Sequence, residues 1–374
     1  MPASDEEAHQ AQVEARAPWE PNVVRGSDGR QHLAYELHIT SFDSGDGPLT
    51  LEKVSVFADG GSQPLLTVQG PEINGLLAKP MDEEHVARGI SIESGRRTVL
   101  FLWLTLPGDA APRTLRHQLD FRTAGGSLQR AAGIVGRVAD RTPIVLGPPL
   151  RGGLWLAAEG PGNAHSHHWG SLVAVDGMLT IPQRFAIDWF GLDENGHSVR
   201  GRHQSLAATT DGDWIGFDHE VLAVADGVVR DVRNDAPDGT PLAPLSVPDD
   251  LTVRTLYGNF VVLEVSPGVF AHYAHLRKDS VTVKVGDHVR RGAVIGRLGQ
   301  SGAAGAPHLH FHVSNRMTFE ESEGLPYLID SFSLLGKSAI EQTFDPSVPV
   351  ALSAPAPAGR RGDMPVDQDV VRFP

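Results

Sequence analysis

Three histidines alternate with apolar residues in the run Pro-His-Leu-His-Phe-His-Val at residues 307–313. On a β-strand, side chains alternate between two faces, so His308, His310 and His312 are expected on the same face. Neutral imidazole is the commonest protein ligand for zinc, and three protein ligands leave a position where the metal activates water. The alternative is a row of solvated histidines on an exposed strand. Pro307 and the glycine-rich residues before it define the strand's start sharply, which favours a metal site.

The composition limits which side chains can complete such a site. The chain has 374 residues, is 40% hydrophobic and contains no cysteine, so the ligands must be His, Asp or Glu and disulfides are excluded. Its 41 glycines and 27 prolines, spread between short Val- and Leu-rich runs, predict a mainly β protein with two or three domains. The net charge of −14, without a basic cluster, does not favour a nucleic acid partner.

The first ten residues are polar and acidic, with neither a basic region nor an apolar stretch. We therefore expect no signal peptide in this sequence. No apolar run approaches the roughly 20 residues that cross a bilayer, so no membrane span is expected either.

Two β domains with irregular ends are expected along the chain. Residues 1–20 are predicted to be a disordered lead-in, because they are polar and rich in Ala, Glu and Gln. Residues 21–147 are predicted to form an Ig-like β-sandwich for structural support or partner binding, because turn signals separate alternating runs. The expected strands of this sandwich are residues 32–40, 49–57, 64–68, 98–105 and 115–121.

Residues 148–345 are predicted to form a second domain, a small and closely wound β layer. Glycines recur there where sharp turns need a positive φ. Residues 346–374, which include an Ala-Pro alternation, are predicted to be a disordered tail. The expected strands of the second domain lie within residues 221–229, 259–265, 269–276 and 281–298, followed by the histidine strand.

Four motifs in the second domain resemble those of the lysostaphin-like or LytM-type zinc metallopeptidases, which cut peptide bonds in bacterial peptidoglycan. The resemblance covers about half of the chain, and its strength lies in the order of the motifs. They are Phe-Ala-Ile-Asp-Trp at 185–189, the Val-rich run at 221–229, Tyr-Ala-His-Leu at 273–276, and Ser-Gly at 301–302 leading into Pro-His-Leu-His-Phe at 307–311.

The resemblance implies a role for four residues of this sequence. Asp188 and His310 would be zinc ligands, and His275 and His308 would be catalytic residues beside the metal. Two residues on one strand face lie about 6–7 Å apart at Cα, so His310 can hold the metal while His308 reaches the activated water.

Each of these roles has an alternative. Asp188 follows the apolar residues 185–187, where a carboxylate needs a metal or a salt bridge, and Arg184 or Arg202 could supply that bridge. His275 could be an ordinary strand histidine at the end of a hairpin.

The sequence departs from the family pattern at the first metal ligand, because Arg184 occupies the position of the usual histidine. The resemblance then implies a branch with an insertion, in which an upstream histidine binds the metal. We choose His168, because Trp169-Gly170-Ser171 resembles the residues after the ligand in related branches, with His167 and then His165 as alternatives. Without any of them, two ligands would be too few for a hydrolytic zinc.

Strand parity predicts the positions of two further histidines. His312 shares the face of His310, at a position where many relatives carry an acidic residue, and would donate to a neighbour of the metal site or line the groove. His272 has the parity opposite to that of His275, so we expect it on the surface.

The resemblance thus implies a zinc-dependent endopeptidase with one Zn²⁺ per chain that hydrolyses peptide bonds in peptidoglycan cross-links or stem peptides. The alternative is a catalytically inactive LytM-like binding or regulatory module. A lipoyl-type carrier domain is disfavoured, because Lys284 sits within a strand pattern rather than at a hairpin tip. The family implies the cell envelope or secretion, whereas the visible N-terminus leaves the cytoplasm open. The sequence does not indicate an oligomeric state.

Overall fold

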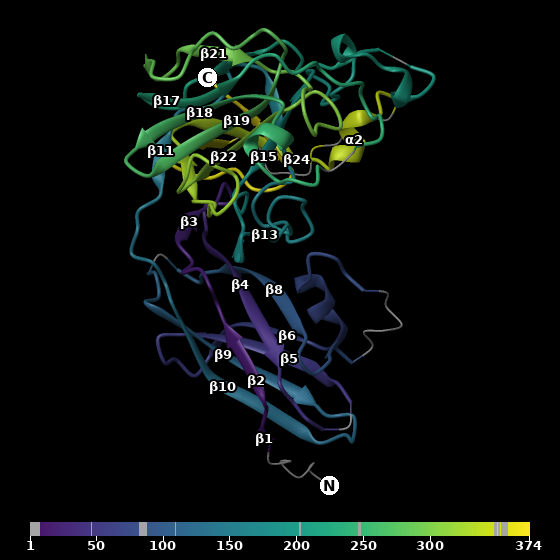
Figure 1. Ribbon diagram of the computed structural model, residues 1–374, viewed down its shortest axis with the longest axis vertical. Coiled ribbons are helices and arrows are strands. Elements are labelled where there is room, and N and C mark those ends of the chain that lie inside the picture. The colour runs from purple at the N-terminus through teal and green to yellow at the C-terminus, as the bar shows by residue number, and fades with distance from the viewer. Residues whose placement is uncertain are drawn as a thin grey trace. The chain divides into compact units, whose positions relative to one another are not determined.

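The structure is a computed structural model that describes residues 8–45, 47–81, 88–108, 110–201, 203–245, 248–347, 350, 352 and 358–374. These residues form a mainly β protein, as predicted (Figure 1). The chain divides into one unit of residues 1–24 and 30–142 and a second of residues 25–29 and 143–374. This division lies between residues 142 and 143, whereas the sequence placed it between 147 and 148.

The first unit is built from two sheets that share one buried core. In β4, Leu33, Tyr35 and Leu37 point inward at alternate positions, because an apolar residue recurs at every second place in the strand. Sheet order is β1-β10-β9-β5-β6 with β7 on β5, and β2-β4-β3 with β8 on β4. The elements are β1 (His9–Gln10), β2 (Val13–Arg16), β3 (Val23–Arg25), β4 (Gln31–Ser41), β5 (Leu49–Ala58), β6 (Pro64–Gln69), η1 (Gly70–Leu76), β7 (Ile90–Ile92), β8 (Arg97–Thr105), β9 (Thr114–Arg122) and β10 (Leu128–Arg137).

All five strands expected in this unit are present, within two residues of their predicted ends. That the sandwich is Ig-like stays a prediction. The disordered lead-in is wrong for residues 8–20, because β1 pairs with β10 and β2 pairs with β4. Val13 and Ala15 alternate with charged residues and pack against the core, so a short edge strand forms in a segment of low overall hydrophobicity. Residues 1–7 lie outside the described residues.

The second unit is dominated by one large sheet, whose described strands follow the order β20-β17-β18-β19-β22-β15-β12-β26-β24-β25. Smaller pairs are β11-β23, β13-β14 and β16-β21. The strands are β11 (Ile144–Leu146), β12 (Leu154–Ala158), β13 (Val173–Val175), β14 (Met178–Thr180), β15 (Ile187–Leu192), β16 (Glu220–Leu222), β17 (Gly227–Arg233), β18 (Asn259–Ser266), β19 (Val269–Leu276), β20 (His288–Val289), β21 (Val294–Arg297), β22 (Leu309–Ser314), β23 (Tyr327–Ile329), β24 (Phe332–Lys337), β25 (Ala358–Arg360) and β26 (Asp369–Arg372), and the helices are η3 (Leu206–Ala208), η4 (Asp211–Asp213), α1 (Val253–Leu256) and α2 (Ile340–Phe344).

The run at 221–229, expected as one strand, divides between two sheets. Its first part forms β16 and its last part begins β17. A Cβ on Gly227 would lie 2.5 Å from the backbone oxygen of Glu264, so only glycine lets the second strand approach β18 there.

The disordered tail is wrong for residues 358–374. β26 pairs with both β12 and β24, and β25 pairs with β24. Val370 and Val371 are fully buried, because β26 is an interior strand covered on both faces. The Ala-Pro stretch that suggested disorder falls largely on residues 353–357, outside the described part of the chain.

No described helix is long and apolar enough to cross a membrane.

Candidate metal centre

The histidine strand β22 lies between β15 and β19 at the centre of the large sheet. The register places Asp188 of β15 directly opposite His310, and His272 of β19 directly opposite His312. His308, His310 and His312 are all buried, which contradicts the alternative of solvated histidines. The sheet therefore brings a carboxylate and several imidazoles together in a region of little water.

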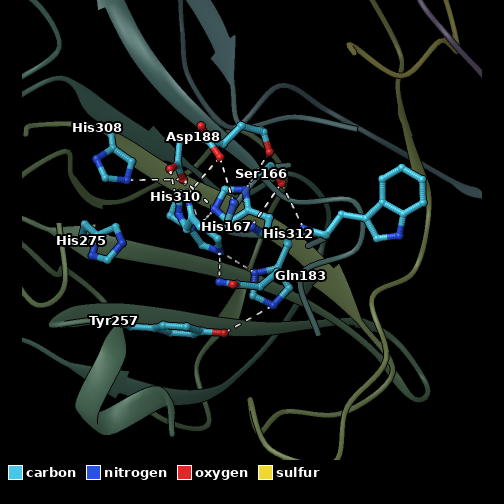
Figure 2. Close-up of polar contacts among 12 residues, drawn as sticks. Ser166, His167, Gln183, Asp188, Tyr257, His275, His308, His310 and His312 are labelled. Carbon is cyan, nitrogen blue, oxygen red and sulfur yellow. Dashed lines mark hydrogen bonds and ion pairs between the residues drawn. The ribbon is translucent and has the colours of Figure 1, made fainter. Parts of the chain in front are cut away.

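Three donor atoms from three chain segments converge here, and Figure 2 shows two of their residues, Asp188 and His310, beside each other. His310 Nδ1 lies 3.0 Å from Asp188 Oδ1 and 3.1 Å from His168 Nε2, and the last two atoms are 3.3 Å apart. Ligand atoms at zinc distances in a tetrahedral site stand about 3.3 Å from one another. The donor set His-His-Asp and its spacing thus fit a zinc ion.

His168 is oriented by the loop that follows β12. Its Nδ1 donates a 2.9 Å hydrogen bond to the backbone oxygen of Glu159, which leaves Nε2 free to face Asp188. Ser166 Oγ accepts hydrogen bonds from the backbone N–H groups of His168 and Trp169, and Trp169 is buried. The loop therefore presents this imidazole in the tautomer that a metal ligand needs.

His167 lies beside the same carboxylate but in a different environment. Its Nε2 is 3.6 Å from Asp188 Oδ2, its Nδ1 is 3.1 Å from a carboxylate oxygen of Glu159, and its side chain is 62% exposed. One ligand atom from each of His167, His168 and Asp188 lies within 4.8 Å of the others. Two sets of three donors are thus available, and the set with His310 is the tighter and more buried one.

His275 and His308 stand next to these donors. His308 Nδ1 donates to the backbone oxygen of Ala306 at 2.7 Å, and its Nε2 lies 3.4 Å from Asp188 Oδ1. His275 Nδ1 donates to the backbone oxygen of Ser301 at 2.9 Å, and its ring centre is 4.8 Å from that of His308. Since both Nδ1 atoms donate to backbone carbonyls, the Nε2 atom of each ring is the one left to face the site.

The position of His275 depends on an unusual backbone conformation. Its φ is +61°, in the left-handed region that non-glycine residues rarely adopt. With strict strand alternation, His272 and Ala274 would lie on one face of β19 and His275 on the other. The positive φ at His275 breaks this alternation and turns its ring toward the site. Strain of this kind is characteristic of functional positions.

This conformation also corrects the expectation for His272, which is fully buried and not on the surface. Its ring stacks on His312 at 4.4 Å, because the two residues are paired in the ladder. The surface position was expected from strict alternation between His272 and His275, and His275 is the residue whose backbone breaks that alternation.

The second ring nitrogen of His310, Nε2, also has polar neighbours. His310 Nε2 lies 2.9 Å from His312 Nδ1 and 3.1 Å from the side-chain amide of Gln183, and His312 Nε2 lies 3.4 Å from the hydroxyl of Tyr257 (Figure 2). If Nδ1 of His310 holds a metal, Nε2 carries the proton and donates it to His312. Sequence reasoning assigned no role at the site to Gln183 or Tyr257, because neither belongs to a chemical motif.

Arg184 does not neutralise Asp188. Its side chain is buried and lies 2.8 Å from a carboxylate oxygen of Glu323, and it donates to the backbone oxygen of Gly324. The alternative in which Arg184 pairs with Asp188 is therefore not observed, and Arg202 lies outside the described residues.

Burial and neighbouring rings set the charges at the site. Burial by itself would raise the pKa of Asp188, but the imidazoles of His308 and His168 hold it well below its ordinary value. Burial lowers the pKa of His310 to about 4 and that of His275 well below the ordinary value. At neutral pH the carboxylate is ionised and these two rings are neutral, as metal ligands and bases must be.

Residues 215–321 match the model described as Peptidase family M23. An uncharacterized metalloprotease of Buchnera aphidicola subsp. Baizongia pistaciae is 33% identical over 81 residues, covering 21% of this chain and 20% of that protein. The peptidoglycan DD-endopeptidase ShyC of Vibrio cholerae serotype O1 is 36% identical over 78 residues, covering 20% and 18%. The matched part of the chain thus spans about a fifth of each of these relatives.

Among solved structures, the catalytic domain of the antimicrobial peptidase lysostaphin from Staphylococcus simulans is 21% identical, covering 35% of this chain and 90% of that chain. The TM-score of this match is 0.21. The family match includes His275, His308 and His310 but begins after His168 and Asp188.

Proposed function

We propose that this chain, which contains a domain of peptidase family M23 at residues 215–321, is a zinc-dependent endopeptidase that hydrolyses peptide bonds in peptidoglycan cross-links or stem peptides. The observation that carries the proposal is the convergence of His168 Nε2, Asp188 Oδ1 and His310 Nδ1 within 3.3 Å of one another. The family match and the peptidoglycan endopeptidase among the relatives support the choice of substrate.

His168, Asp188 and His310 would hold the zinc. Zinc in such a site supplies a Lewis acid that polarises the scissile carbonyl and makes water more acidic. The carboxylate remains ionised because the surrounding imidazoles hold its pKa low, and burial keeps His310 neutral. The protein thus offers one carboxylate oxygen and two imidazole nitrogens as ligands.

His308 and His275 would move the proton. The Nε2 of His308 faces the site, so it accepts a proton from the attacking water as the water oxygen bonds to the carbonyl carbon. The imidazolium so formed gives this proton to the leaving amine when the C–N bond breaks. His275, whose Nε2 is also unprotonated, orients the water through a second hydrogen bond.

Digestion of purified peptidoglycan tests this proposal. The zinc-reconstituted full chain should release soluble peptides whose masses identify the cleaved bond, and the same protein after chelation should not. His308→Ala, loaded with zinc, is the matched control and should release none. Zinc-loaded wild-type protein that binds peptidoglycan without cleaving it would replace the proposal by the inactive binding module.

A further inference from the structure

The loop that carries His168 contacts a segment that lies 204 to 207 residues later in the sequence. We propose that Asp367 is a positioning residue for the metal site, which fixes the loop at residues 159–168 so that His168 meets Asp188 and His310. The inference rests on the proposed function, since it matters only if His168 is a metal ligand.

Asp367 contacts this loop at three points. Its Oδ1 accepts a 2.8 Å hydrogen bond from the backbone N–H of Gly160, and its Oδ2 accepts one of 3.2 Å from the side-chain amide of Asn163. Its own backbone N–H donates to the oxygen of Pro161 at 3.0 Å. One residue thus fixes both the position and the direction of the loop where it leaves β12.

These contacts continue from the loop to the imidazole. The backbone oxygen of Asn163 accepts from Ser166 N–H at 3.2 Å, and Ser166 Oγ accepts from His168 N–H at 3.2 Å. Glu159, directly before Gly160, accepts the Nδ1 proton of His168 through its backbone oxygen. A shift of the loop at Gly160 or Asn163 would therefore move or rotate the ring.

The segment with Asp367 is itself firmly held. Gln368 N–H donates to the oxygen of Ala157 at 2.8 Å, and β26 then pairs with β12. The carboxylate of Asp369 contacts Lys337 at 2.8 Å and also accepts from Ser27. Asp367 therefore extends from a fixed strand end rather than from a free terminus.

Packing alone does not fix the loop in this place. A Cβ on Gly160 would stand 3.1 Å from the backbone of Asp367, so the two backbones touch there. Beside this contact lies a cavity of about 90 Å³ whose lining includes Glu159, Asn163, Glu341 and Asp367. Because side chains leave this space unfilled, the polar contacts of Asp367 hold this part of the loop where packing is incomplete.

The test is the zinc affinity of full-length variants, measured by competition with a chromophoric chelator. Asp367→Ala should bind zinc about tenfold more weakly or worse, the range typical for residues that orient a ligand. Asp367→Asn keeps an acceptor for Gly160 but opposes the amide of Asn163, so its loss should be intermediate. Glu341→Ala removes a carboxylate from the same cavity without removing these contacts, and its affinity should stay within about twofold of wild type.

The visible absorption of bound Co²⁺ provides a second readout, since a role in overall stability alone would not alter the ligand geometry. Its spectrum should change in Asp367→Ala and in Asn163→Ala, which removes the same contact from the loop side, and not in Glu341→Ala. If Asp367→Ala does not fold, Asp367→Asn and Asn163→Ala carry the test.

The outcomes separate this inference from the proposed function. If wild-type protein binds one zinc, His310→Ala loses it, and the Asp367 and Asn163 variants bind zinc as tightly as wild type, the inference is wrong and the proposed function stands. If wild-type protein binds no zinc, the proposed function itself fails, and the inference fails with it.

Discussion

Asp188 Oδ1 is the point on which the imidazoles converge. His310, His168 and His308 each place a ring nitrogen between 3.0 and 3.4 Å from this one oxygen. The three rings are not equivalent, because His310 and His168 are turned toward each other at 3.1 Å and His308 stands apart, stacked on Phe190. The arrangement thus sets His310 and His168, the proposed ligands, apart from His308, the proposed base.

Removing a ligand and removing the base should therefore have different effects. His310→Ala and Asp188→Ala should each lose bound zinc and activity together, because two protein ligands do not retain a hydrolytic zinc. His308→Ala should keep its zinc and lose at least about 100-fold in kcat, the usual contribution of a general base. Zinc content and peptide release measured on the same preparations check this, and loss of zinc from His308→Ala would contradict its assignment.

The two neighbouring histidines of the first loop can be distinguished in the same way. His168→Ala should lose zinc, because its Nε2 faces the buried donors. His167→Ala should retain it, because that ring is exposed and paired with Glu159. Elemental analysis after dialysis is the measurement. The opposite pattern would make His167 the ligand and would exclude the route by which Asp367 acts on His168.

At the scale of elements, regular strands could be predicted from the sequence and departures from regularity could not. Alternation located the strands of the first unit and the inward face of His310 and His312. It failed for His272, because a positive φ at His275 interrupts the period of two. Alternation also did not predict β26. The apolar run Val370-Val371 is too short to indicate an interior strand unless its pairing with β12 is known.

Close backbone contacts at two glycines explain how the backbone oxygen of Ser301 reaches His275. A Cβ on Gly258 would lie 2.3 Å from the carbonyl carbon of Ser301, and one on Gly302 would lie 2.3 Å from the nitrogen of Gly258. These glycines bring Ser301 against the end of β19, where its oxygen holds His275. The need for glycine is visible in the sequence, but the partner segment is not.

The position of Asp367 predicts a dependence of stability on pH. Burial raises the pKa of Asp367 from 3.8 to about 6, so folding favours the protonated form. This stabilisation is complete below about pH 4 and is lost as the pH rises through 6, a change of about 3 kcal/mol for a shift of this size. Asp367→Asn cannot ionise, so between pH 4 and 7.5 the free energy of unfolding of wild type should fall relative to that of the variant.

Denaturant unfolding of both metal-free proteins across this pH range measures the difference. Comparing the two proteins cancels the titration of the histidines and the other carboxylates. Curves that stay parallel from pH 4 to 7.5 would mean that Asp367 is already ionised in the folded protein at low pH.

At the scale of the whole molecule, the proposed zinc ligands and the proposed catalytic histidines all come from the second unit, and each unit has its own buried core. Zinc should therefore stabilise only one of two unfolding transitions, by about 4 kcal/mol at a free concentration 1,000 times the Kd. Scanning calorimetry with zinc and with chelator measures this shift directly.

Core substitutions identify the two transitions. Leu102→Ala, in the first unit, should lower the melting temperature only of the transition that zinc does not shift. Leu263→Ala, in the second unit, should lower only that of the zinc-sensitive transition. Both residues are fully buried, so each substitution should cost about 3 kcal/mol. A zinc-sensitive transition lowered by Leu102→Ala would show that the units are energetically coupled.

The zinc content of purified, chelator-washed and zinc-reconstituted wild-type protein tests the central claim most directly. Elemental mass spectrometry should find about one zinc per chain, held by His168, Asp188 and His310. Reconstituted protein that retains no zinc would contradict the metal site, and with it the proposed hydrolysis of peptidoglycan.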